Sequence, residues 1–107
     1  MLNQVVLVGR IEHMETVDKV TIVTIIVPRA YKNVDGNYDS DHIPVQMTNS
    51  IATNTLNYCK TNDIIGVKGS LRNVGISDRI ELLAEKVTFL SSHNPSVSED
   101  EPNIEIE

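Results

Sequence analysis

The sequence has little of what disulfide-bonded, metal-binding and membrane proteins need. Its 107 residues include one cysteine, Cys59, no tryptophan and four aromatic residues in all. A single cysteine excludes an internal disulfide and a cysteine-rich zinc site. No apolar run approaches the ~20 residues of a membrane-spanning helix. No basic residue precedes the apolar segment 5–8, so we expect no secretory signal. These absences favour a cytoplasmic protein of one domain.

Catalytic and metal-binding patterns are also missing. The histidines, His13, His42 and His93, form no pair at metal-ligand spacing. The segment 35–39 resembles a calcium loop only superficially, because the sixth position of such a loop is serine here and the twelfth is glutamine. No glycine-rich phosphate loop and no acid–base or nucleophilic arrangement is present. We therefore expect no enzyme, no metal and no cofactor, and a binding function instead.

The net charge of −6 is concentrated at one end of the chain. Residues 1–90 carry nine basic and ten acidic residues, a net charge of −1, whereas residues 91–107 carry five acidic residues and no basic one. A nearly neutral body is compatible with a local basic groove. The segment 91–107 is rich in serine, proline, asparagine and acids, so we predict a disordered acidic tail.

The body of the chain is dominated by β-branched, apolar segments, which favour strands. We predict strands over residues 3–11, 20–27, 42–48, 64–71 and 79–90, and a short helix over about 51–60. Ser50 is expected to cap the helix, and Pro28 to end the second strand. This order is that of an all-β, five-stranded OB-fold barrel with one short helix between strands 3 and 4. The order alone leaves other small barrels open.

The second predicted strand is apolar on both faces. One face carries Val20, Ile22 and Ile26, and the other carries Val23, Ile25 and Val27. An apolar face on the outside of a sheet is usually covered, and in so small a chain we expect the cover to be another subunit. The alternative is a strand that is simply hydrophobic on both sides.

Three segments follow one another along the chain: LNQVVLVGRI at 2–11, PRAYKN at 28–33 and DIIGVKGSLR at 63–72. They resemble, in that order, the first strand, the end of the second strand and the fourth strand of bacterial single-stranded DNA-binding proteins. The resemblance covers about residues 2–90. It implies an OB-fold single-stranded DNA-binding domain over residues 1–90, followed by the tail.

The resemblance also implies a function and partners. Members of the family bind single-stranded DNA without marked sequence preference in DNA replication, repair and recombination, and they act in the cytoplasm as homo-oligomers. We expect a homotetramer or a homodimer, and a diverged member such as one carried by a mobile element or phage. Two alternatives stay open. One is an OB-fold adaptor of a primosome-like complex that acts mainly through protein–protein contacts, and the other is a purely structural subunit.

Candidate DNA-binding residues follow from the same resemblance, because these proteins combine cations on phosphates with aromatic platforms for bases. The candidates at strand ends and hairpins are Arg10, Arg29, Tyr31, Lys32, His42, Lys68 and Arg72. His42 occupies a position that is usually aromatic. The usual aromatic near the third strand's end falls on Thr48, and segment 73–78 has none. We therefore predict weak, strongly salt-dependent binding. For each cation, an ordinary solvated charge is the alternative.

The acidic tail departs from the family pattern. Ile104 and Ile106 alternate with acids at the end of the chain, which suggests a reduced docking segment for replication or repair proteins. The alternative is a solubilising end that competes for the basic groove.

Overall fold

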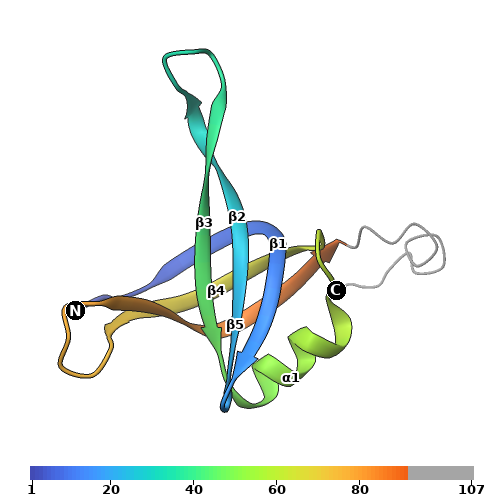
Figure 1. Cartoon of the computed structure of the whole chain (residues 1–107), viewed down its shortest axis with the longest axis vertical. Coiled ribbons are helices and arrows are strands. Elements are labelled where there is room, and N and C mark those ends of the chain that lie inside the picture. Colours follow the sequence, from blue (N-terminus) through green and yellow to red (C-terminus); the bar gives the residue numbers. More distant parts are fainter. Residues whose placement is uncertain (92–107) are drawn as a thin grey trace.

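Five strands and one helix form a closed barrel in the computed structural model, which describes residues 1–91 (Figure 1). The elements are β1 (Val5–Val17), β2 (Val20–Lys32), β3 (Tyr38–Met47), α1 (Asn49–Tyr58), β4 (Ile64–Asn73) and β5 (Ile80–Ser91). The strands follow one another around the barrel as β1-β2-β3-β5-β4. All neighbouring pairs are antiparallel except the short parallel contact between β3 and β5. The predicted five-stranded barrel, with its helix between strands 3 and 4, is confirmed.

Strand β1 is longer than predicted and pairs with two neighbouring strands. Its first half, Val5 to Arg10, pairs with β4, and its second half, Arg10 to Val17, pairs with β2. The register shifts between Ile11 and His13, so Glu12 is the extra residue of a β-bulge. A bulge resets the alternation of inward and outward side chains. The polar residues after Ile11 therefore extend the strand, although their polarity alone predicts its end.

The prediction that Pro28 ends the second strand is wrong. β2 continues to Lys32, and Pro28 lies opposite Ser40 of β3. The ladder is irregular between Pro28 and Lys32, and a proline is tolerated where the strand does not need its missing N–H. As a result, β3 begins at Tyr38 instead of near His42, and the β2–β3 hairpin projects well beyond the barrel (Figure 1).

The core is built from inward side chains of all five strands and from the helix. Its fully buried members include Ile11, Val23, Val45 and Ile65, and Leu82 of β5 completes the ring of strands. The inward face of β2 is thus buried, as expected. Its outward residues, which the sequence also shows as apolar, are only half-buried in the single chain.

The helix lies at one end of the barrel. Its buried positions are Ala52 and Thr55, and Tyr58 packs near Phe89 of β5 with ring centroids 6.2 Å apart. The helix begins at Asn49, and Thr48 occupies the N-cap, so the prediction of a Ser50 cap is wrong. The reason is that β3 ends at Met47 and the first helical hydrogen bond already runs from the Ala52 N–H to the Thr48 carbonyl.

Cys59 follows the helix and is buried, as expected for a core cysteine. Its burial, together with the negative charge of Asp63, raises the pKa of the thiol to about 11. A thiol that stays protonated at neutral pH is a poor nucleophile. Among residues 1–91 no cluster of metal-ligating side chains is present, and no helix there is long and apolar enough to cross a membrane.

Candidate nucleic-acid interface

The projecting hairpin carries an aromatic and a basic residue, Tyr31 and Lys32, that are consecutive in the sequence. Tyr31 is 68 % exposed near the end of β2, and Lys32 lies opposite Tyr38 of β3. The Lys32 ammonium lies 5.9 Å from the centroid of the Tyr38 ring, within the range of a cation–π contact. The hairpin therefore carries two exposed aromatic rings, Tyr31 and Tyr38, and the Lys32 ammonium lies against the second of them. Aromatic rings and cations are the two kinds of group that bind single strands.

Asn33 organises the tip of this hairpin. Its side-chain oxygen accepts hydrogen bonds from the backbone N–H groups of Asp35 and Asn37, at 2.9 and 3.0 Å. Gly36 has a φ of 84°, a conformation that favours glycine. The Asp-Gly pair at 35–36 thus forms the turn, and its internal hydrogen bonds hold the two arms of the hairpin in register.

Arg29 lies at the base of the projecting arm, and carboxylates already hold it. Its Nη2 donates to Oδ1 of Asp41 at 2.8 Å and its Nε donates to Oδ2 at 3.2 Å, while Nη1 is 3.9 Å from Asp39. The hydrogen bond raises the pKa of Arg29 and lowers that of Asp41. A phosphate that binds Arg29 must therefore compete with Asp41.

His42 also has a carboxylate partner. It lies opposite Ile26 on the central strand β2, and its Nδ1 is 2.9 Å from Oε1 of Glu12. The two side chains are 54 % and 38 % exposed, respectively. Glu12 reaches His42 from β1 because it follows the buried Ile11 in the strand and so lies on the outer face, as Arg10 does. Sequence reasoning missed Glu12, because only the strand order, with β2 between β1 and β3, brings residues 12 and 42 together.

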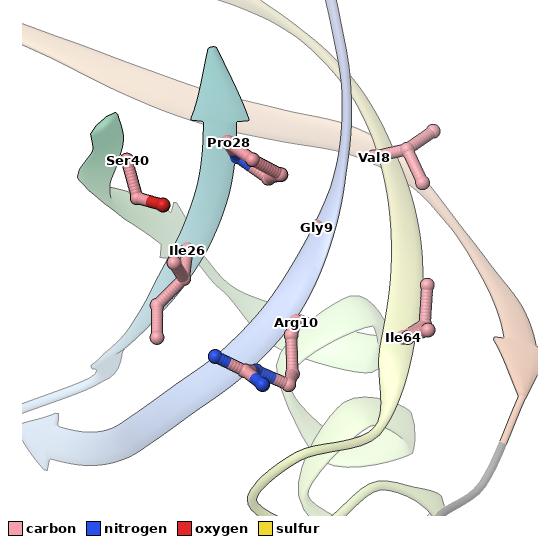
Figure 2. Close-up of a pocket in the computed structure, with 7 residues that line it drawn as sticks. All are labelled: Val8, Gly9, Arg10, Ile26, Pro28, Ser40 and Ile64. Atoms are coloured by element: carbon pink, nitrogen blue, oxygen red, sulfur yellow. The ribbon is translucent and has the colours of Figure 1, made fainter. Parts of the chain in front are cut away.

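Arg10 lines a shallow hollow of about 390 Å³ on the outside of the barrel. The hollow lies where β1 turns from β4 to β2, and its other lining residues are Val8, Gly9, Ile26, Pro28, Ser40 and Ile64. Figure 2 shows the Arg10 guanidinium extending from β1 toward the β2 side of this hollow. Because Ile26 lies between Arg10 and His42 in the sheet, Arg10 belongs to the same face as His42.

The remaining predicted cations lie on β4, away from the hairpin. Lys68 lies opposite Val6 of β1 and Lys86 of β5. Arg72 lies opposite Glu81, with Nε 3.8 Å from its carboxylate. The structure thus brings Arg10, Arg29, Tyr31, Lys32 and His42 onto β1, β2 and β3, and leaves Lys68 and Arg72 as a separate pair. Ile104 and Ile106 lie outside the described residues.

Comparisons with known proteins agree with this architecture. No family model matches the chain. The chain is 31 % identical over 107 residues to single-stranded DNA-binding protein 2 of Staphylococcus aureus (strain COL), covering 88 % of this chain and 77 % of that protein. It is 29 % identical over 103 residues to single-stranded DNA-binding protein B of Bacillus subtilis (strain 168), covering 84 % and 91 %.

Two solved structures share the fold. One is a small single-stranded DNA-binding protein from Mycoplasma pneumoniae, with a TM-score of 0.66 and 24 % identity over 81 % of this chain and 92 % of that one. The other is a mitochondrial single-stranded DNA-binding protein from S. cerevisiae, with a TM-score of 0.65 and 16 % identity over 86 % and 99 %. The predicted OB-fold is confirmed. By its sequence and its fold, the chain belongs to the bacterial single-stranded DNA-binding protein family.

Proposed function

We propose that this chain binds single-stranded DNA without marked sequence preference, chiefly through the β2–β3 hairpin. The observation that carries the proposal is the exposed pair Tyr31 and Lys32 on the projecting arm, in a chain of this family. Tyr31 offers its ring to a base, and Lys32 offers a charge to the adjoining phosphate. The relatives are named as binding proteins, and we likewise propose no enzymatic activity for this chain.

The other candidates play graded parts in this proposal. Arg10 and His42 continue the path of the bound DNA from the hairpin onto the barrel. Arg29 contributes once a phosphate displaces Asp41. Lys68 and Arg72 act as secondary phosphate contacts on β4.

The balance of charges on the hairpin supports weak, salt-dependent binding. Residues 29–42 contain two cations, Arg29 and Lys32, and three carboxylates. Each phosphate that a cation neutralises on a single strand contributes about −0.7 to the slope of log K against log salt. With few unpaired cations and few aromatic platforms, affinity is expected to be modest and to fall as salt increases.

The test uses two tyrosines of nearly equal exposure. Tyr31 is 68 % exposed on the hairpin and Tyr58 is 71 % exposed on the helix. We expect Tyr31→Ala to weaken binding of a labelled oligo-dT of about 35 nucleotides by ~1–3 kcal/mol, roughly 5- to 150-fold. Lys32→Ala should weaken binding mostly at low salt. Tyr58→Ala is the control, with no loss expected.

Fluorescence anisotropy at low and near-physiological salt, with matched duplex for comparison, measures these affinities. Two results would contradict the proposal. The first is a chain that shows no preference for the single strand over the duplex even at low salt. The second is an equal loss of affinity in Tyr31→Ala and Tyr58→Ala, which would place the contact elsewhere.

We also propose that the chain associates with copies of itself, as a homodimer or a homotetramer. Val6 and Val8 are 67 % and 53 % exposed on the outer face of β1. Over residues 5–9, β1 pairs with β4 alone in the part of the chain that the structure describes, so its other edge offers backbone donors and acceptors. Sedimentation velocity of Val6→Glu tests this. The variant should have a lower mass than the parent. A parent with the mass of a single chain would contradict the proposal, and an oligomeric parent with an unchanged variant would exclude this face of β1 as the contact.

The cellular role rests on family resemblance. We propose that the chain acts in the cytoplasm in DNA replication, repair or recombination. Docking of replication or repair proteins by Ile104 and Ile106 stays a prediction. The adaptor alternative, in which protein contacts dominate, gains support if the anisotropy experiment shows no single-strand preference.

A further inference from the structure

The pair formed by Glu12 and His42 carries an inference that rests on the proposed function. Where the resemblance expects an aromatic ring, this chain has an ionisable ring held by a carboxylate at 2.9 Å. The carboxylate comes from the bulge residue of β1 and the ring comes from β3, so the contact crosses β2, which lies between these strands. The contact therefore spans the face on which Arg10 also lies.

The contact fixes the chemistry of the imidazole ring. A carboxylate only accepts hydrogen bonds, so the Nδ1 of His42 must donate, and the proton of the neutral ring lies on Nδ1. Nε2 is then an acceptor in the neutral ring and becomes an N–H donor when the ring is protonated. Glu12 thus determines which ring nitrogen is left for an outside partner.

The charges around His42 come from all three strands. On β1, Glu12 contacts the ring, and Arg10 lies opposite Ile26, the neighbour of His42. On β3, Asp41 precedes His42, and its carboxylate is bound by Arg29 of β2. Arg29 and Asp41 neutralise each other, so the local charge depends on whether the His42 ring of the Glu12–His42 pair is protonated. The pair is negative when the ring is neutral, and it is neutral overall when the ring is protonated.

We propose that Glu12 is a positioning residue that orients His42, and that protonation of His42 at Nε2 tightens the binding of single-stranded DNA. The protonated ring cancels the charge of Glu12, which otherwise repels the phosphates. It also offers an Nε2–H donor to a phosphate or a base edge. Single-strand binding is therefore coupled to the uptake of a proton.

The experiment follows oligo-dT binding by anisotropy from pH 8 to pH 5.5 at constant low salt, with the full chain. We expect the affinity to rise roughly threefold to tenfold on acidification. His42→Phe keeps a flat aromatic ring without a titratable nitrogen, so its affinity should not change with pH. His13→Gln is the matched control, because His13 is another exposed histidine near a glutamate, with Nε2 3.9 Å from Glu15. It should keep the pH dependence of the parent.

Glu12→Gln separates positioning from charge. The glutamine oxygen still accepts from Nδ1, so the ring stays oriented, while the negative charge is removed. We expect tighter binding than the parent at pH 8, because the charge that repels the phosphates is gone. Glu12→Ala removes both the orientation of the ring and the negative charge. It should lose most of the rise in affinity that the parent shows at pH 5.5.

Three results distinguish the possible failures. If the parent does not bind oligo-dT at any pH, the proposed function is wrong. If it binds with an affinity that does not change with pH, the proposed function stands and this inference is wrong. If His42→Phe keeps the pH dependence while His13→Gln loses it, the proton binds elsewhere and the inference is overturned. Both histidines are exposed and Glu12 is partly exposed, and circular dichroism checks that each variant is folded.

Discussion

Replacing Gly9 with alanine should destabilise the barrel strongly, because β1 approaches β2 closely at this residue. Gly9 lies where β1 leaves β4 and joins β2, next to the first β1–β2 pair, Arg10 and Ile26. A Cβ on Gly9 would lie 2.6 Å from the Ile26 carbonyl oxygen and 3.0 Å from Cγ2 of Val27. Ordinary contacts of a Cβ begin near 3.4 Å. The two backbones must therefore separate, since a carbonyl cannot rotate away as a side-chain tip does.

The size of the effect follows from what must separate. Overpacking a tight site typically costs ~1–3 kcal/mol, and weakening a neighbouring ladder hydrogen bond costs ~1 kcal/mol more. We expect Gly9→Ala to lower the free energy of unfolding by about 2–4 kcal/mol. For a domain of this size, each kcal/mol shifts the Tm by roughly 4–8 °C. The Tm should thus fall by at least ~8 °C.

Gly66→Ala is the matched control for this prediction. Gly66 lies opposite Val8 in the next strand, but the atom nearest to a Cβ added at Gly66, Cδ1 of Leu90, would be 3.7 Å away. This substitution should change stability by only about 0.5 kcal/mol in either direction. Urea and thermal denaturation at equal protein concentration compare the two variants. If Gly9→Ala is as stable as Gly66→Ala, the close approach at Gly9 does not constrain the fold.

Three further outcomes are expected. Thr55 is fully buried, and its hydroxyl has no hydrogen-bond partner among residues 1–91, so Thr55→Val should raise the free energy of unfolding by ~1 kcal/mol in urea denaturation; a loss would reveal a partner. The pKa of Cys59 is raised from 9.0 to about 11, so only the unfolded chain ionises at first and stability should fall between pH 9 and 11. Cys59→Ala should lack that part of the fall, and identical pH profiles would contradict this. Asp41→Asn releases Arg29 and should make the salt slope of oligo-dT binding more negative by about 0.7; an unchanged slope would mean that Arg29 makes no phosphate contact.

Most of the fold could be predicted because its signals are local. The runs 20–27 and 64–71 are β-branched and apolar over a strand's length, and the helix shows its own spacing. The errors occurred where tertiary pairing overrides a local signal. Pro28 usually ends a strand, but it lies here at an irregularity of the β2–β3 ladder. The polar stretch after Ile11 stays in β1 because the bulge at Glu12 resets the pattern.

The site was predictable only in part, for a different reason. Tyr31 and Lys32 could be proposed as site residues because they belong to a recognisable segment. Their exposure on the hairpin is consistent with that assignment. The carboxylate partners could not be identified, because Glu12 and His42 are 30 residues apart and meet only through the strand order. Arg29 and Asp41 meet only through the hairpin register.

These partners change how a basic composition should be interpreted in this chain. Arg29 and Lys32 are equivalent in a count of charges, but the structure gives them different neighbours. Arg29 is bound by a carboxylate at 2.8 Å, so a phosphate gains only the difference between two anionic partners. Within residues 1–91 Lys32 forms no ion pair, and its neighbour is the face of the Tyr38 ring. A phosphate can bind that ammonium without displacing an anion. We therefore expect Lys32, beside Tyr31, to contribute more to single-strand affinity than Arg29, although arginine is usually the stronger phosphate ligand.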